Sequence, residues 1–371
     1  MRFFSIVLSF LMVCRLSAQP KQFYLLAGTY TDGKSEGIYT YQFNPETGNT
    51  QIVNTVIASN PSYLAISKDE KYIYAIRDTR KGGNSEVAAY HFNKNTGKLT
   101  LINKQTEKGS GACYITVDSR NKWVFMANYA SGNLSALAIR KDGGIDTVKQ
   151  FFQDTGKSIN PTRQKEVHVH TAVFSPDEKY LFVTDLGNDI IHQFPFNASA
   201  DCPLSITNEK IIKSKAGNGP RHLAFSSDNK FMYVINELSG TIDVFDFKKK
   251  QFELIQTIST DSTQSDTKGS ADIHLSPDGK FLYVTNRGNY NTISSYNVLS
   301  NGQLKLLQVL PSGGIMPRNF VIDPTGNYLL IGHQKSDNIT FFKRDKITGL
   351  LTKTEQNIQV GSPVCLKFIN L

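Results

Sequence analysis

The sequence is poor in cysteine and in tryptophan. Four cysteines occur in 371 residues, and Trp123 is the only tryptophan. So few cysteines exclude a disulfide framework as the main source of stability. A single tryptophan argues against a carbohydrate-binding platform of stacked aromatic rings and against Trp-Asp repeat scaffolds. The fold must instead rest on an ordinary apolar core, which a hydrophobic content of 39% permits.

Long apolar runs are absent except at the N-terminus. Residues 3–13 are mostly apolar, follow Arg2 and precede small residues that end at Ala18. The run is shorter than the roughly 20 residues of a membrane-spanning helix and is typical of a secretory signal peptide. We predict cleavage after Ala18, a periplasmic or secreted protein, and one mature domain over residues 19–371. Lipidation at Cys14 is the alternative, although a bulky residue before that cysteine disfavours it.

Acidic residues are fewer than basic ones. The formal net charge of +9 becomes +7 when Arg2 and Arg15 leave with the signal peptide. The lysines are spread along the chain, with one local run at residues 248–250, which is not the pattern of a nucleic-acid site. A basic excess of this size suits small anions, acidic polysaccharide or simple solubility.

A pattern recurs through the chain about every 50 residues. Each copy has an apolar run, a Ser/Asp-Pro-Asp-Gly type turn, and a run that alternates aromatic and β-branched residues, which is typical of a β-hairpin. The copies begin near Tyr63, Tyr114, Thr171, His222, Ile273 and Asn319. Each hairpin is followed by a third short strand, such as 241–247, and usually by a weaker fourth. Few helical patterns occur, so we predict an all-β fold, a β-propeller of four-stranded antiparallel blades.

The two ends of the chain complete the number of blades. Six hairpins are visible, and residues 23–29 form a strand whose incoming partner is missing but can be supplied by residues 363–369. We therefore predict a seven-bladed propeller, closed by pairing of the segment near 364–368 with that near 24–28. Such pairing ties down chain ends that would otherwise fray. The alternatives, an open β-solenoid or two β-sandwiches, would leave both ends unpaired.

One end of the repeated hairpin carries polar side chains that differ from copy to copy. Positions are counted here from the Ser or Asp that opens each hairpin turn. The residues five positions before it, and ten and eleven positions after it, lie at the same end of an antiparallel hairpin, so they should gather at one mouth of the central channel. The set contains Arg77, Asp78, His170, Asp185, Arg221, Asn236, Glu237, Asn286, Arg287, Arg318, His333 and Gln334. Because buried charge is costly unless it is paired or used, we predict a functional site there. The residues ten after the turn have an alternative role, in which they satisfy loop backbone.

His168 and His170 have a spacing that places both on one side of a strand. The pair has three interpretations: the start of a metal site, a hydrogen-bonded structural pair, or groups for acid–base chemistry or substrate binding. A zinc site needs further ligands close by, and His222 and His274 lie in other repeats and out of phase. We therefore predict no metal and no cofactor.

Eight short segments together resemble a known family. They are 28–31 (GTYT), 60–64 (NPSYL), 168–170 (HVH), 185–187 (DLG), 219–222 (GPRH), 236–238 (NEL), 286–288 (NRG) and 317–320 (PRNF). Their order is similar to that in the seven-bladed propeller lactonases of the 6-phosphogluconolactonase type, and the fungal carboxy-muconate lactonizing enzymes are similar too. The resemblance covers essentially all of the chain after the signal peptide.

The resemblance implies hydrolysis of a sugar-type lactone. It also implies that His168 or His170, Arg221, Glu237 and Arg287 form the active site. Two features depart from the family pattern. Tyr114 stands where a histidine usually follows the cysteine, and the signal peptide is unexpected because phosphogluconolactone belongs to cytosolic sugar metabolism.

Opening a lactone requires a general base and stabilisation of the developing oxyanion. No Gly-x-Ser-x-Gly elbow is present to indicate a serine nucleophile. We expect Glu237 or His170 to activate a water, while Arg221 and Arg287 hold the anionic part of the substrate and polarise the carbonyl. Further substrate-binding candidates are Arg318, Asn236, Asn286, Asp185, His333 and Gln334. The alternative function is a non-catalytic exported propeller that binds a glycan or a partner protein at the same channel mouth.

Overall fold

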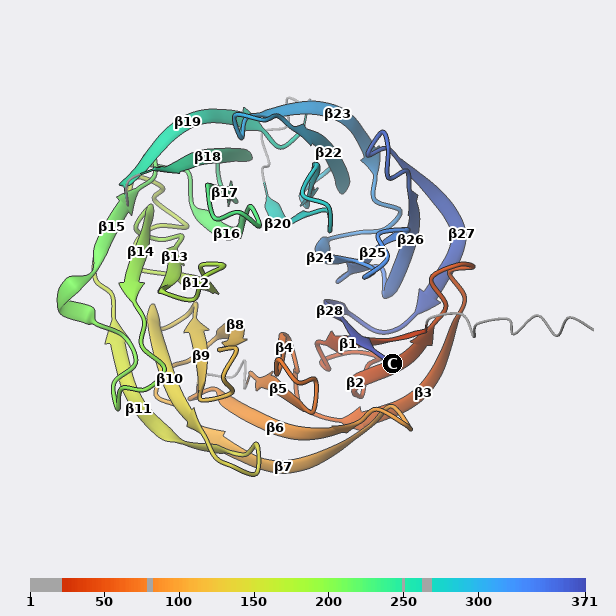
Figure 1. Cartoon of the computed structure of the whole chain (residues 1–371), viewed down its shortest axis with the longest axis horizontal. Helices are drawn as coiled ribbons and strands as arrows, with labels where there is room; N and C mark the ends of the chain where they lie inside the picture. The colour runs from red at the N-terminus through yellow and green to blue at the C-terminus, as the bar shows by residue number, and fades with distance from the viewer. Residues whose placement is uncertain (1–21, 79–82, 249–250, 262–268) are drawn as a thin grey trace, which may run out of the picture.

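The described residues form a ring of seven β-sheets. The computed structural model describes residues 22–78, 83–248, 251–261 and 269–371. These residues contain 28 strands in seven sheets of four strands each, and one 3-10 turn, Ile206–Asn208. The sheets are arranged around a common axis like blades (Figure 1). The predicted seven-bladed β-propeller is therefore confirmed. The predicted signal peptide lies outside the described residues.

Each blade runs from an inner strand beside the axis to an outer strand at the rim (Figure 1). The inner strands are β4 (Leu64–Ile66), β8 (Ala112–Val117), β12 (Val169–Phe174), β16 (Pro220–Phe225), β20 (Ser270–Leu275), β24 (Pro317–Ile322) and β28 (Pro363–Asn370). The second strands are β1 (Phe23–Thr29), β5 (Tyr72–Arg77), β9 (Trp123–Asn128), β13 (Tyr180–Asp185), β17 (Phe231–Asn236), β21 (Phe281–Asn286) and β25 (Tyr328–His333).

The third and fourth strands complete each blade. The third strands are β2 (Gly37–Phe43), β6 (Glu86–Asn93), β10 (Asn133–Ile139), β14 (Ile190–Pro195), β18 (Thr241–Lys248), β22 (Thr292–Val298) and β26 (Asn338–Arg344). The outer strands are β3 (Thr50–Ile57), β7 (Lys98–Thr106), β11 (Ile145–Gln153), β15 (Lys210–Lys213), β19 (Gln251–Ser259), β23 (Leu304–Pro311) and β27 (Leu351–Gln359).

The hydrophobic pattern explains the order of strands within a blade. The second strands are buried on both faces between neighbouring blades, and β9 and β25 are buried along their whole length. Because both faces are buried, the sequences of these strands are nearly continuous apolar runs. The outer strands face solvent on one side, so β27 mixes exposed with buried positions. The core accordingly lies between the blades, where apolar side chains of adjacent sheets pack together.

The ring is closed by its two ends, as the sequence predicts. Strand β28 pairs antiparallel with β1, with Leu26 opposite Lys367 and Gly28 opposite Cys365. A Cβ atom on Gly28 would lie 2.4 Å from the carbonyl oxygen of Pro61. Only glycine permits this close approach between the first blade and the connection to the second.

The hairpin turns between inner and second strands are built by the Ser or Asp that opens each of them. Ser276 Oγ accepts a hydrogen bond from the Phe281 amide at 3.0 Å, and Asp118 Oδ1 accepts one from the Trp123 amide at 2.6 Å. These side chains replace missing backbone partners in a tight turn. These turns lie on one face of the ring. The polar residues at the other end of each hairpin therefore lie on the opposite face.

Candidate active site

The inner strands share a β-bulge that redirects one side chain in each of five blades. In β16 the pairing passes from Pro220 opposite Asn236 to His222 opposite Ile235, so Arg221 has no partner on β17. The same shift occurs in β8, β12, β20 and β24. A bulge changes the direction in which its side chain projects. The residues at this position are Cys113, His170, Arg221, Ala271 and Arg318.

The residues that follow the second strands are fixed by one further backbone bond. The amide of Glu237 donates to the Gly219 carbonyl at 2.8 Å, and the amide of Arg287 donates to the Gly269 carbonyl at 3.0 Å. These bonds extend the antiparallel ladder by one residue at the end of each hairpin. They hold the side chains of Glu237 and Arg287 beside the bulged residues.

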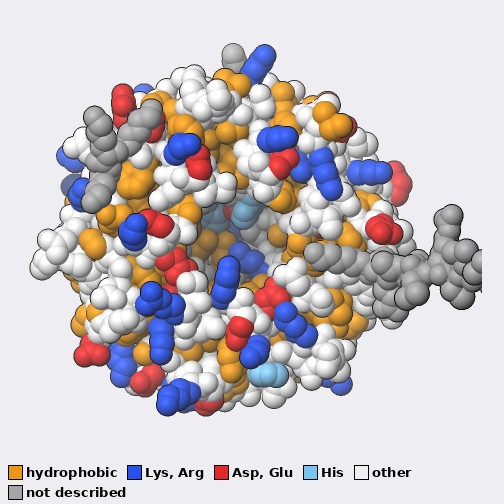
Figure 2. All heavy atoms as spheres, in the orientation of Figure 1, with side chains coloured by type: hydrophobic (Ala, Val, Ile, Leu, Met, Phe, Trp, Pro, Cys, Tyr) orange, Lys and Arg blue, Asp and Glu red, His pale blue; other side chains and the backbone are white. Residues whose placement is uncertain are grey.

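Three of the bulged residues, Cys113, His170 and Arg318, line a cavity of about 450 Å³ together with Glu237 and Arg287. Its lining residues are Tyr30, Asp78, Gly111, Ala112, Cys113, Tyr129, Arg163, His170, Glu237, Arg287 and Arg318. Of the polar set predicted from the sequence, it thus brings together Asp78, His170, Glu237, Arg287 and Arg318. Figure 2 shows the opposite face of the ring, which carries the hairpin turns and is also hollowed at its centre.

Glu237 is surrounded by three arginines. Its Oε1 lies 2.7 Å from Nη2 of Arg163, and its Oε2 lies 2.7 Å from Nη2 of Arg287 and 3.1 Å from Nε of Arg221. Burial alone would raise the pKa of this carboxyl group, but Arg287, Arg221 and Arg163 together lower it well below its ordinary value. Glu237 is therefore a paired carboxylate, and the arginines occupy the oxygen atoms that a general base would use.

Arg221 lies beneath the cavity rather than on its wall. Its side chain is only 2% exposed, and its Nη1 donates a hydrogen bond to the carbonyl of Ala271. Burial, followed by the charges of neighbouring arginines, lowers its pKa to about 9, so the group is still protonated at neutral pH. Arg221 contacts Glu237 from below, which differs from the direct substrate contact expected from the sequence.

His170 is the histidine on the cavity wall. Its side chain is buried, and within the described part of the chain its Nδ1 has no hydrogen-bond partner. Burial, followed by the charge of Arg221, lowers the pKa of His170 well below its ordinary value. The imidazole is therefore neutral at pH 7, and a neutral imidazole carries a lone pair that can accept a proton.

Cys113 is the one cysteine on the cavity wall. Its Sγ lies 3.2 Å from the carbonyl oxygen of His170. Burial raises the pKa of this thiol to about 12. Because the thiolate is the nucleophilic form, Cys113 is a wall residue and not a nucleophile at neutral pH.

His168 packs against Tyr129 behind the cavity wall. Its ring stacks on Tyr129 at a centroid distance of 4.2 Å, its Nδ1 lies 2.9 Å from the Tyr129 carbonyl oxygen, and its amide donates to Asp185. His168 is not among the residues that line the cavity. His168 therefore supports the wall residue Tyr129, whose ring also contacts His170 edge-on at 5.8 Å.

The residues ten after the turn bind loops and neighbouring strands instead of lining the cavity. Asn236 donates to Asp243 at 2.9 Å, and Asn286 donates to the Thr260 carbonyl at 3.1 Å. Asp185, His333 and the following residue Gln334 are likewise absent from the lining. This placement agrees with the alternative given above, in which such residues satisfy local hydrogen bonds.

One buried group of side chains has the composition of a metal site. Among the described residues, ligand atoms of Asp154, Asp185 and His192 lie within 4.8 Å of one another. However, His192 already contacts Asp154 Oδ2 at 2.7 Å through Nε2 and Glu209 through Nδ1. These contacts satisfy both ring nitrogens without an ion. The group therefore joins the third and fourth blades as a hydrogen-bonded network.

The sequence reasoning missed Arg163. This residue lies in the connection between β11 and β12, the longest connection between blades. It has no counterpart in other copies, so comparison of repeats could not reveal it. Its Nη2 also lies 3.0 Å from the hydroxyl of Tyr129, and the side chain is 43% exposed at the cavity wall. In the sequence, only the unusual length of this connection sets Arg163 apart from other exposed arginines.

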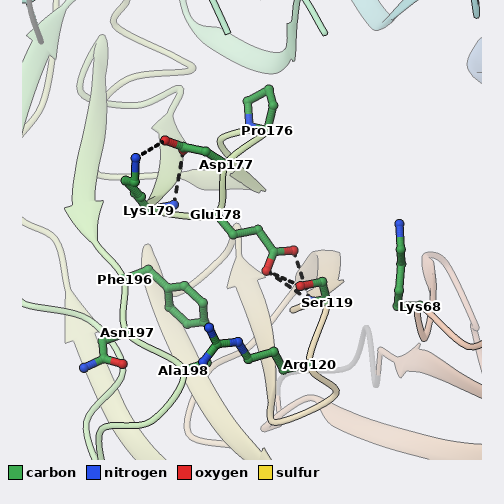
Figure 3. A pocket seen from close by; sticks show the side chains of 10 residues that line it. All are labelled: Lys68, Ser119, Arg120, Pro176, Asp177, Glu178, Lys179, Phe196, Asn197 and Ala198. Atoms are coloured by element: carbon green, nitrogen blue, oxygen red, sulfur yellow. Dashed lines mark hydrogen bonds and ion pairs between the residues drawn. The ribbon is translucent and has the colours of Figure 1, made fainter. Parts of the chain in front are cut away.

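A larger hollow of about 640 Å³ lies on the opposite face, among the turns of three neighbouring blades (Figure 3). Both of its acidic groups have partners: Glu178 accepts from Ser119 Oγ at 2.5 Å, and Asp177 lies 3.1 Å from Lys179. No group there combines burial with an unpaired nitrogen as His170 does. The smaller cavity is therefore the candidate active site.

Within the described residues, no helix is long and apolar enough to cross a membrane.

Comparison with known proteins agrees with this geometry. The family described as "Lactonase, 7-bladed beta-propeller" matches residues 24–368. A 6-phosphogluconolactonase of Formosa agariphila is 37% identical over 347 residues, which cover 92% of this chain and 98% of that protein. A solved structure from Bacteroides fragilis is 38% identical, with a TM-score of 0.90 and coverage of 95% of this chain and 99% of that one.

A third relative is the periplasmic gluconolactonase PpgL of Pseudomonas aeruginosa. Its structure is 33% identical, with a TM-score of 0.88, and the match covers 94% of this chain and 99% of that one. The match extends over the whole ring, beyond the segments that carry the cavity. The chain therefore belongs to the seven-bladed β-propeller lactonases, a family of carboxylic ester hydrolases.

Proposed function

We propose that this protein hydrolyses an anionic sugar-type lactone in the cavity that contains His170 and Glu237. The observation that carries the proposal is the charge of the site. Arg163, Arg287 and Arg318 line the cavity with two carboxylates, Glu237 and Asp78, and a fourth arginine lies directly below. Guanidinium groups bind carboxylate and phosphate in a planar, two-pronged geometry. An excess of them favours a substrate with a negative group.

The names of two relatives support this substrate class. The Formosa protein is named a 6-phosphogluconolactonase and the Pseudomonas protein a periplasmic gluconolactonase. Both names specify a gluconolactone, and they differ in the phosphate. The positive excess of the cavity in the present chain favours the phosphorylated or otherwise anionic member of this class.

We assign the base to His170. The sequence left Glu237 and His170 as alternatives, and the three arginine contacts of Glu237 make its carboxylate a poor proton acceptor. The neutral imidazole of His170 takes a proton from water, and the resulting hydroxide attacks the lactone carbonyl. Arg287 and Arg163 lie close enough to stabilise the oxyanion. The ester C–O bond then breaks, and the leaving ring oxygen takes the proton from His170.

The test is hydrolysis of a panel of lactones by purified mature protein. We expect the protein to open phosphorylated or carboxylated sugar lactones with a higher kcat/KM than their neutral analogues. Added salt should reduce that preference because it screens the arginines. Equal kcat/KM for charged and neutral lactones would contradict the anionic substrate, and no hydrolysis above the spontaneous rate would contradict the function itself.

We also infer that the protein is exported, with residues 1–18 removed to leave the mature chain 19–371. The short apolar segment and the periplasmic location named for the Pseudomonas relative support this inference. Mass spectrometry of the protein from a periplasmic fraction should show a chain that begins at Gln19. An intact Met1 on soluble cytosolic protein would contradict both cleavage and export.

A further inference from the structure

A second polar layer lies in the channel beneath the candidate active site, where it lines a separate cavity of about 340 Å³. It is formed by the residues one position after the bulge, where His222 of β16 faces Asp272 of β20. Nδ1 of His222 lies 2.7 Å from Oδ1 of Asp272, and both side chains are buried. Neither residue lines the cavity above, and the proposed hydrolysis gives neither a role.

Asp272 is an ionised carboxylate with several donors. It also accepts hydrogen bonds from Asn319 Nδ2 at 2.5 Å and from the Phe320 amide at 3.1 Å, and His274 Nε2 lies 3.0 Å away. Burial alone would raise its pKa, but the contacts with His274 and His222 lower it well below its ordinary value. A carboxylate so fully surrounded by donors has a fixed position.

The contact with Asp272 determines the tautomer of His222. An ionised carboxylate only accepts, so Nδ1 of His222 must donate to it. Burial, followed by the charge of Arg221, lowers the pKa of His222 to about 4, so the ring is neutral at pH 7 and its Nε2 carries a lone pair. That lone pair faces Nη1 of Arg221 at 3.3 Å.

Aromatic rings hold the imidazole of His222 between them. Tyr114 and His170 present their rings to it at centroid distances of 5.4 and 5.1 Å, both at steep angles. Edge-to-face contacts of this kind restrict rotation of the ring. In this packing Nε2 of His222 faces Arg221.

We propose that His222, whose tautomer is set by Asp272, is a positioning residue that holds the guanidinium of Arg221 beneath Glu237. Arg221 in turn contacts Glu237 Oε2 at 3.1 Å, and Glu237 holds Arg163 and Arg287 at the cavity wall. A continuous series of buried contacts thus links His222 in the channel to the two arginines at the cavity wall, so the position of His222 affects theirs. This inference rests on the proposed lactone hydrolysis for its activity readout.

Two substitutions of His222 separate its two contacts. In His222→Asn the amide lies near the former Nδ1, so the bond to Asp272 is kept and the acceptor for Arg221 is lost. In His222→Gln the amide lies near the former Nε2, so the acceptor is kept and the bond to Asp272 is lost. We expect His222→Asn to reduce kcat/KM for an anionic lactone about 10-fold or more, mainly through KM, because displaced arginines bind the anion poorly. His222→Gln should stay within about 3-fold of wild type but melt at a lower temperature.

His274→Asn is the matched control. His274 contacts the same carboxylate, Asp272, but the structure gives it no contact with Arg221. Its replacement should lower the melting temperature and leave kcat/KM unchanged. A purely structural role for His222 predicts the opposite ranking of its variants: His222→Gln, the less stable protein, would be the less active, and His222→Asn would match wild type. That result would overturn the proposal.

A binding measurement keeps the inference separate from the proposed reaction. If the wild type opens no lactone, the proposed function fails, and calorimetry with 6-phosphogluconate, an anionic sugar acid, then tests the positioning alone. We expect His222→Asn to bind it about 10-fold more weakly than wild type and His222→Gln to bind it within about 3-fold. Equal affinity in all three proteins, or no binding by the wild type, would overturn the role of His222.

Discussion

Nη2 of Arg163 lies 2.7 Å from Oε1 of Glu237, a residue 74 positions later in the chain. The contact joins the connection between β11 and β12 to the end of β17, across the mouth of the channel. One wall of the cavity therefore depends on an ion pair whose arginine is half-exposed and whose carboxylate is buried. Because Glu237 keeps two other arginine partners, Arg163 can be replaced without leaving a buried charge unpaired.

Arg163→Ala should raise KM for an anionic lactone about 10-fold and change KM for a neutral analogue little. The reason is the loss of one charge-assisted contact to the anion. The melting temperature should stay close to that of wild type, since ion pairs with an exposed partner contribute about 0–1 kcal/mol. Steady-state kinetics on both lactones measure the effect. Arg140→Ala, which removes an exposed arginine paired with Asp142, is the control and should change neither KM.

His170→Gln should lower kcat by about 10²–10⁴-fold and leave KM nearly unchanged, because a general base acts in the transition state. Thermal melts should show a folded protein, since a neutral amide replaces a neutral ring. Retention of more than a tenth of the wild-type kcat would remove His170 from the role of base.

Glu237→Gln should damage stability as well as activity. The substitution leaves Arg221, Arg287 and Arg163 without their common counter-ion, and breaking a buried ion pair in this way costs about 3–5 kcal/mol. Denaturant unfolding measures the loss. If instead the variant unfolds like wild type while kcat falls about 10²-fold, Glu237 is the base and the assignment to His170 is wrong.

The pH dependence of kcat/KM should have no acid limb near 6.5. Burial and the surrounding arginines lower the pKa of His170, so the base stays unprotonated from pH 8 down past pH 6, and activity falls only in more acidic solution. A bound anion offsets the arginine charges, which raises the pKa of His170 in the complex. The acid limb of kcat should therefore lie at higher pH than that of kcat/KM. A midpoint near 6.5 in kcat/KM would indicate an exposed, unperturbed imidazole.

Deletion of residues 363–371 should lower the melting temperature by more than about 10 °C. The deletion removes β28, the inner strand of the first blade, and exposes buried apolar side chains of β1. Deletion of Leu371 alone is the control, because that residue is exposed and outside the strand. Equal melting temperatures for the long deletion and the control would contradict closure of the ring by the chain ends.

The sequence by itself determined the architecture and the face that carries the cavity. Hairpin turns and strand alternation are local patterns, so six copies and two complementary ends were enough to predict seven blades. The phase of the repeat also placed His170, Glu237, Arg287 and Arg318 at one channel mouth. That inference was possible because an antiparallel hairpin fixes which residues share an end.

The tertiary structure alone decided which of these polar residues face the cavity. Asn236 and Glu237 are neighbours in sequence, yet the first binds Asp243 and the second lines the cavity. Arg221 occupies the same bulge position as the wall residue His170, yet it is buried below, where it contacts Glu237 and the Ala271 carbonyl. Arg163 reaches the site from a connection outside the repeat. These outcomes depend on side-chain direction and on partners from distant blades, and neither is encoded in the local period of the strands.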